Sequence, residues 1–182
     1  MSAATLEAQL VARARAAEGA EREAACRQIY ETLRRRVFGL CLRMCGERTL
    51  AEDAMQNAFL AAFRGLRTFR GQSQLSTWIY RVAIREALAL RTRRPPAAEL
   101  TEAETVPSNA APVDAQVAAR QQARAVQAAF QTLSADHQAV LSLFAVEGLE
   151  HKQIAEVLGI PEGTVWYRLH EARKALRERA SL

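Results

Sequence analysis

Apolar side chains recur every three or four positions along most of the chain, the spacing that places them on one face of an α-helix. In the first half this spacing predicts helices over residues 6–17, 21–45, 49–66 and 76–91. Gly19, Gly46 and Gly71 separate them, and Ser76 or Thr77 can cap the fourth. Glu52 and Asp53 are expected in the first turn of the third helix, where acids favour the helix dipole.

The pattern is interrupted after Pro95-Pro96, which ends the fourth helix. Residues 95–116 are rich in Ala, Pro, Thr and acids and have no periodicity, which predicts a flexible acidic linker. Helical spacing resumes near 117 and predicts helices over 125–133, 135–146, 151–158 and 161–179. No strand-like alternation is present. We therefore expect an all-α protein of two small helical domains, 1–94 and 117–182, joined by the linker.

Residues 151–173 have the form helix, glycine turn, helix that is typical of the DNA-reading helix-turn-helix. Gly159 supplies the turn, and Pro161 suits the first position of the second helix. The alternative is a helical pair that packs only on itself or on a partner protein. If the second helix reads base edges, the candidates away from its apolar stripe are Gly163, Thr164, Trp166, Tyr167, Arg168, His170, Arg173 and Lys174.

A second candidate surface lies in residues 69–94, where three aromatics and six Arg accompany a single acid. Aromatic faces stack on unpaired bases and guanidinium groups hold phosphates, so this composition favours binding of single-stranded nucleic acid. A core helix with a solvated basic face would have the same composition. Trp78 and Tyr80 are two positions apart and cannot share a helix face. Of the two, we expect Trp78 to be structural and Tyr80 to stack on bases.

The charge and the cysteine content indicate which kinds of partner and site the protein can have. The net charge of the 182 residues is +5, and residues 1–94 carry 17 Arg against nine acids, which indicates nucleic acid rather than a membrane surface. No apolar run is long enough for a membrane span or a signal peptide, so we expect a cytoplasmic protein without membrane insertion. The three cysteines are expected to be buried thiols. No phosphate loop, metal-ligand cluster or catalytic triad is recognisable, so we expect no enzyme activity, cofactor or metal.

Two stretches in this order resemble bacterial RNA polymerase sigma factors of the short extracytoplasmic-function (ECF) type. AEDAMQNAFLAAFRGLRTFRGQSQLSTWIYRVA, residues 51–83, resembles the second conserved region of that family, with an acid-rich helix start, Gln, Phe, FRG and then TW-Y-R. GLEHKQIAEVLGIPEGTVWYRLHEARKAL, residues 148–176, is similar to its fourth region. The resemblance covers nearly everything except the linker.

The resemblance implies that the first domain docks on the clamp of core RNA polymerase and grips the melted minus-ten promoter element. It assigns polymerase binding to Glu52, Asp53, Gln56, Asn57 and Phe59, although Phe59 has the alternative of lying in the core. It assigns minus-ten DNA binding to Arg70, Gln72, Ser73, Gln74, Trp78, Tyr80, Arg81 and Arg85. Within that set, Gln72 to Gln74 are candidates for capturing a flipped base.

The second domain, by the same resemblance, reads the minus-thirty-five element as duplex DNA and contacts the polymerase flap. An anti-sigma factor is the expected regulator. Two departures stand out: Arg85 replaces a frequent Asn, and Trp166-Tyr167-Arg168 replaces the usual Lys-Ser-Arg. The alternative functions are an autonomous helix-turn-helix regulator and a sigma-like decoy that binds only a regulatory protein.

Overall fold

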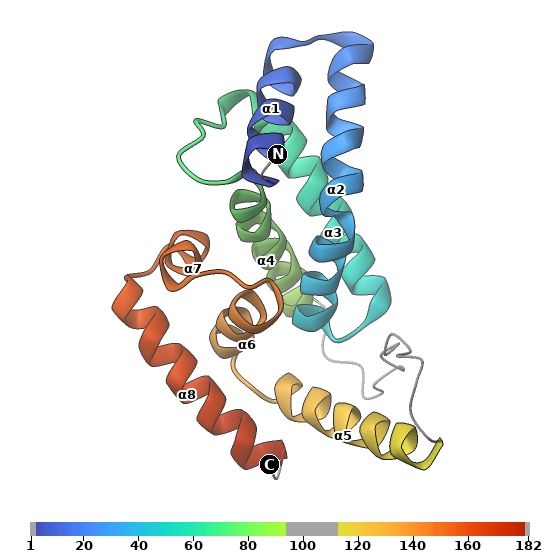
Figure 1. The fold of residues 1–182 in the computed structure, drawn as a ribbon, viewed down its shortest axis with the longest axis vertical. Helices are drawn as coiled ribbons and strands as arrows, with labels where there is room; N and C mark the ends of the chain where they lie inside the picture. Colours follow the sequence, from blue (N-terminus) through green and yellow to red (C-terminus); the bar gives the residue numbers. More distant parts are fainter. Residues whose placement is uncertain (1–2, 94–112, 181–182) are drawn as a thin grey trace.

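The computed structural model describes residues 3–93 and 113–180, and every regular element in these two ranges is helical (Figure 1). The all-α fold class with two helical domains is confirmed, while the domain boundaries at 94 and 117 stay predictions. Residues 95–112 of the predicted linker lie outside the described ranges. The elements are α1 (Ala3–Ala16), α2 (Gly19–Cys45), α3 (Arg48–Gly65), the 3₁₀-helix η1 (Leu66–Thr68), α4 (Leu75–Arg93), α5 (Val113–Gln131), α6 (Ala135–Leu141), the π-helix η2 (Ser142–Val146), α7 (His151–Leu158) and α8 (Glu162–Ala180).

The first half packs α1 to α4 against one another around apolar side chains, at the end of the molecule where α1 ends and α2 begins (Figure 1). The stripe of α3 that faces this core is made of small side chains, with Ala51, Ala54, Ala58 and Ala62 all buried. Helices approach one another closely where the side chains between them are small. The alanine stripe therefore lets α2 and α4 lie directly against α3.

Several helix starts differ from the predictions, and three of them bear on the predicted sites and linker. Helix α3 begins at Arg48, so Glu52 and Asp53 follow its first turn instead of occupying it. Helix α4 begins at Leu75, so Ser76 and Thr77 lie inside it and are buried instead of capping it. Helix α5 begins at Val113, within the predicted linker. The starts of α3 and α4 depart by a single residue, because the apolar pattern fixes the middle of a helix better than its ends. The start of α5 departs by twelve residues from the predicted 125.

The carboxylate of Glu7 on α1 replaces the predicted cap of α4. Its Oε2 accepts a hydrogen bond from the Ser76 backbone N–H at 3.0 Å and one from the Ser76 hydroxyl at 3.2 Å. Backbone N–H groups in the first turn of a helix have no partner within the helix and are usually satisfied by a neighbouring side chain. A residue 69 positions earlier in the chain therefore satisfies the start of α4.

In the second half the observed helices agree more closely with those predicted from the sequence. Ser134 caps α6 by accepting from the His137 backbone N–H at 3.3 Å, and Gly159 adopts a left-handed φ of 67° between α7 and α8, both as predicted. The predicted helix 135–146 is instead α6 followed by the π-helix η2. Helix α8 begins at Glu162, one residue after Pro161. This half thus contains the predicted helix-turn-helix.

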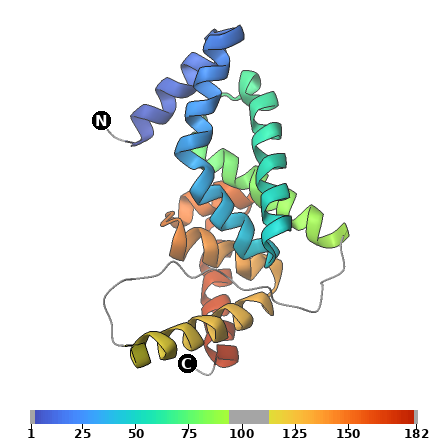
Figure 2. The same cartoon turned by 90° about the vertical axis from the view of Figure 1, so that its right-hand side faces the viewer.

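The two halves are packed against each other in this structure. Helix α7 lies on α4, and α6 lies on α2, as the two perpendicular views show (Figures 1 and 2). Arg91 near the end of α4 donates to the Met44 carbonyl and to the Gln138 side chain, which is fully buried at the junction. In the ranges that the structure describes, no helix is both long and apolar enough to cross a membrane.

Candidate nucleic-acid interface

Helix α8 buries one face and presents the other to solvent. Val165, Leu169 and Ala172 pack into the core. On the far side Tyr167 is 67% exposed and Trp166 is 60% exposed, which is unusual for side chains of this size. The other predicted base-reading residues on this side are also exposed, namely Gly163, His170, Arg173 and Lys174. The helix-turn-helix therefore offers an outward face with two aromatic side chains near the start of its second helix.

Two residues of the predicted set point elsewhere. The Arg168 guanidinium forms an ion pair with Asp136 of α6 at 2.7 Å, and only 25% of its side chain is exposed. Thr164 is half-buried. These positions border the apolar stripe of α8, and there the structure draws Arg168 toward α6 and away from the outward face.

The segment between η1 and α4 holds three of the predicted minus-ten residues in the open. Arg70, Gln72 and Gln74 are exposed, and Ser73 is half-buried. Gly71 has a left-handed φ of 70° with open space around it, so the chain turns here in a conformation that favours glycine. Side chains on such a loop are free to meet a ligand, which suits the predicted base capture.

Trp78 anchors this loop to the start of α4. It is half-buried, its ring lies 5.0 Å from the ring of buried Phe69, and a Cβ added to Gly65 would come within 3.2 Å of it. Since Gly65 leaves just enough space for the indole, Trp78 holds η1, the loop and α4 together. Trp78 is only partly buried, whereas Tyr80, the residue of the pair predicted to be open, is the more deeply buried one.

Tyr80, the predicted stacking residue, is fully buried between the two halves. Its hydroxyl donates to the carboxylate of Glu147 at 2.9 Å, and burial together with that negative charge raises the pKa of the phenol. In this arrangement its ring is closed to any base.

The carboxylate of Glu147 accepts hydrogen bonds from three side chains of the first half. Besides Tyr80, it accepts from Arg36 at 3.0 Å and from Arg43 at 2.9 Å, and Arg36 also donates to its backbone carbonyl at 3.0 Å. The Glu147 side chain is only 3% exposed. Burial lowers the pKa of the Arg43 guanidinium and the nearby carboxylate opposes that shift. We call these four residues the Glu147 cluster.

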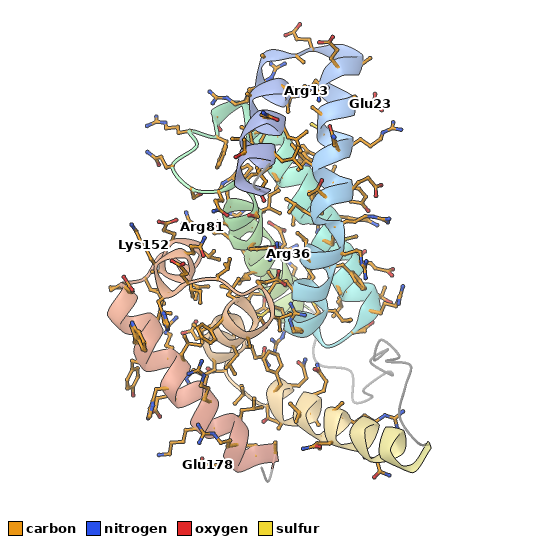
Figure 3. The ribbon with its side chains drawn as sticks, viewed as in Figure 1. Arg13, Glu23, Arg36, Arg81, Lys152 and Glu178 are labelled. Atoms are coloured by element: carbon orange, nitrogen blue, oxygen red, sulfur yellow. The ribbon has the colours of Figure 1, made fainter. Side chains whose placement is uncertain are left out.

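Arg81 and Arg85 lie on the outer side of α4. Both are exposed: Arg81 donates through Nε to the Val157 carbonyl of α7 at 3.0 Å, and Arg85 lies beside Glu86 at 3.5 Å. Arg36 and Arg81 both lie where the first half meets the second (Figure 3). The second half therefore contacts two of the predicted minus-ten residues, Tyr80 and Arg81, and leaves Arg85 open.

The predicted polymerase-binding residues all lie on α3. Asp53, Gln56 and Asn57 are exposed on its outer face, and Glu52 is half-exposed and paired with Arg48 at 3.0 Å. Phe59 is buried, with its ring edge-on to Tyr30 at 4.9 Å. Phe59 therefore belongs to the core, which is the alternative that its apolar character favoured.

Sequence reasoning missed the Glu147 cluster apart from Tyr80. The one available signal was the position of Glu147, the single charged residue in the largely apolar stretch 139–149. A charged group in such a stretch is buried only when it has a partner, and helix periodicity does not say from which part of the chain that partner comes.

Comparison with known proteins identifies the family. A model of sigma-70 region 2 matches residues 29–94, and a model of sigma-70 region 4 matches residues 123–176. RNA polymerase sigma-H factor of Pseudomonas aeruginosa is 36% identical over 151 residues, covering 78% of each chain. The ECF RNA polymerase sigma-E factor of Haemophilus influenzae is 31% identical over 154 residues, covering 79% of this chain and 81% of the relative. The chain belongs to the ECF sigma factors.

Solved structures agree on the fold of this sigma factor. It superposes on CnrH in complex with the cytosolic domain of CnrY with a TM-score of 0.70 at 21% identity, covering 94% of this chain and 95% of that one. RpoE of Bartonella quintana, in complex with the anti-sigma factor NepR, gives 0.67 at 19% identity and coverages of 86% and 96%. Helices α2 to α4 hold region 2, and α5 to α8 hold region 4.

Proposed function

We propose that this sigma factor binds core RNA polymerase and directs it to specific promoters through two separate DNA-binding surfaces. The observation that carries the proposal is the outward face of α8, where Tyr167 and Trp166 are exposed on the second helix of a helix-turn-helix in region 4. A helix that presents its first turns in this way fits the major groove of duplex DNA. This surface would read the minus-thirty-five element.

The second surface combines the loop 70–74 with the outer side of α4, and would hold the melted minus-ten strand. Gln72 and Gln74 are open for hydrogen bonds to an extruded base, and Arg70 and Arg85 are open for phosphates. Tyr80 can join them only if the second half moves away, because its ring is fully buried by the present packing. We therefore infer that the two halves separate when the sigma factor engages a promoter.

The exposed polar face of α3 would dock on the polymerase. Asp53, Gln56 and Asn57 lie along it without involvement in the core. This face is separate from the junction with the second half, so it is open to the polymerase in the packed arrangement.

Regulation by an anti-sigma factor is part of the proposal. Its support is the relation to ECF sigma factors and the likeness of fold to RpoE of Bartonella quintana, which was solved with the anti-sigma factor NepR. Such a partner would act by retaining the packed arrangement, in which Tyr80 and Arg81 are occupied by the second half.

Run-off transcription with core RNA polymerase on genomic promoter fragments, with and without the protein, tests the proposal. We expect promoter-specific transcripts only when both are present. Gel-shift assays of the protein alone on the same fragments are the control. Tight, dimeric duplex binding without polymerase, together with no promoter-dependent transcript, would instead identify an autonomous helix-turn-helix regulator.

A further inference from the structure

The indole of Trp166 is exposed on one side and stacks on a neighbouring ring on the other. It lies flat against the imidazole of His151, with ring centroids 3.9 Å apart and planes 4° apart. His151 is the first residue of α7, the other helix of the helix-turn-helix. An exposed aromatic on a helix surface normally samples several rotamers, whereas a parallel stack restricts it to one.

The stack continues into a circuit of four side chains from three elements, which is closed only through the backbone of α8. The His151 ring lies 5.3 Å from the ring of Phe144 in η2, and the guanidinium of Arg173 lies 4.7 Å above that same Phe144 ring. Arg173 follows Trp166 by seven residues, which is two turns along the same edge of α8. The circuit therefore begins and ends on α8 and fixes two of its exposed side chains through residues outside that helix.

The position of Trp166 and His151 within the helix-turn-helix indicates what the stack could contact. In helix-turn-helix proteins the second helix enters the major groove by its first turns, and the first helix crosses the DNA backbone. Trp166 is the fifth residue of α8, and His151 opens α7. In that docking geometry the stacked pair would lie where the groove meets the backbone, and a flat indole supported by a second ring would offer an apolar wall to base edges and thymine methyl groups.

We propose that His151 is a positioning residue for promoter recognition: it holds the Trp166 indole in the orientation that sets the minus-thirty-five preference. The inference rests on the proposed function, because it assumes that α8 reads duplex DNA. It adds a specificity determinant that lies outside the recognition helix. Arg173 is oriented through Phe144 in the same circuit.

The first test measures the stack without polymerase or DNA. The chain has two tryptophans, so Trp78→Phe leaves Trp166 as a single fluorophore. We expect fluorescence anisotropy decay to show an indole that turns with the whole molecule. His151→Ala should add a fast local motion, and His151→Phe should suppress it because a flat ring is restored. The same decay in all three proteins would overturn the positioning role.

The second test measures promoter preference with the holoenzyme, on a pool of duplexes randomised at the minus-thirty-five element and with Trp78 intact. His151→Ala should reduce discrimination roughly 2- to 12-fold at the positions that Trp166→Ala also affects, the range expected for loss of an aromatic pair. The double variant should lose no more than Trp166→Ala alone, and His151→Phe should recover most of the preference.

Lys152→Ala is the matched control, since Lys152 is the exposed next residue of α7 (Figure 3). Loss of a phosphate contact weakens binding nearly uniformly across sequences. A uniform loss in His151→Ala, or additive effects of the His151 and Trp166 changes, would overturn the proposal. If the unmodified holoenzyme shows no minus-thirty-five preference, the proposed function fails as well, while the anisotropy result still reports on the stack.

Discussion

Tyr167 and Arg168 are neighbours on α8, yet they meet different surroundings. Tyr167 is 67% exposed, whereas Arg168 is turned to Asp136 and paired with it at 2.7 Å. Both belong to the predicted base-reading set, because helix periodicity places them on the polar side of the stripe formed by Val165 and Leu169. Periodicity predicts on which side of its own helix a side chain lies. It does not predict which other helix packs next to that side, as α6 does next to Arg168.

Tyr167→Ala should change promoter preference. If the ring contacts base edges, its loss should cost about 1 kcal/mol of discrimination at one or two promoter positions. Holoenzyme selection on randomised minus-thirty-five elements measures this. Arg168→Ala is the control, since a partly exposed ion pair contributes about 0–1 kcal/mol to folding and should leave the profile unchanged. An unaltered profile in Tyr167→Ala would refute its base-reading role.

Of the three cysteines predicted to be buried, only Cys41 is fully buried, whereas Cys26 and Cys45 are partly buried. Cys41 is fully buried, and burial raises the pKa of its thiol to about 12. Burial also raises the pKa of Cys45, to about 11. Thiols with such values stay protonated at neutral pH and pack as small hydrophobic groups. Their spacing of four residues on α2 was sufficient to predict a shared face.

At the scale of elements, the start of α4 depends on another helix. Ser76 and Thr77 have the residue types of N-caps, and their hydroxyls could cap a helix that began after them. The helix begins earlier because Glu7 of α1 reaches the Ser76 N–H and supplies the cap. A local sequence pattern contains no information about an acceptor 69 residues away.

Glu7→Ala should destabilise the first half. It removes the acceptor of two hydrogen bonds at the start of α4, and the loss of a capping side chain typically costs about 0.5–2 kcal/mol. Urea unfolding followed by circular dichroism measures the change. Gln9→Ala, an exposed position on the same helix, should stay within about 0.5 kcal/mol. Equal stability of the two variants would show that Glu7 does not act as the cap.

The π-helix η2 is the element that periodicity could not predict. Residues 135–146 have an uninterrupted helical pattern, but the chain widens into a π-turn at Ser142 before Glu147. Single π-turns inside helices frequently occur near functional sites. Here the turn ends directly before the carboxylate that joins the two halves, and its Phe144 backs the His151–Trp166 stack.

At the scale of the whole molecule, the Glu147 cluster holds region 4 against region 2. One buried carboxylate takes hydrogen bonds from Arg36, Arg43 and Tyr80, and Arg81 donates to the Val157 carbonyl of α7. The residues that we assign to minus-ten binding are thus divided. Those on the loop are open, and Tyr80 and Arg81 on α4 contact the second half.

Glu147→Ala should favour the separated arrangement. Removing one partner of a buried ion pair leaves the other uncompensated, at a cost of about 3–5 kcal/mol, which the Arg43 guanidinium escapes when the halves part. We expect a larger radius of gyration in small-angle X-ray scattering, with unchanged helix content. Tighter binding of a labelled single strand carrying the minus-ten sequence should accompany it.

The matched control for this experiment is Glu178→Ala, an exposed acid near the end of α8 (Figure 3). It removes the same charge from the same half and touches none of the cluster. Compact scattering in Glu147→Ala, equal to that of Glu178→Ala, would contradict a role of the cluster in holding the halves together.

By itself the sequence determined the helices, the helix-turn-helix and the family, because each depends on residues that are close together in the chain. Apolar spacing defined the faces, Gly159 defined the turn, and the two motif sets indicated ECF sigma factors. Only the tertiary structure decided that Tyr80 is buried, that Glu7 caps α4 and that the His151 ring stacks on Trp166. Each of these joins residues from different helices, and burial, hydrogen bonding and ring stacking depend on how the helices pack in space rather than on their order along the chain.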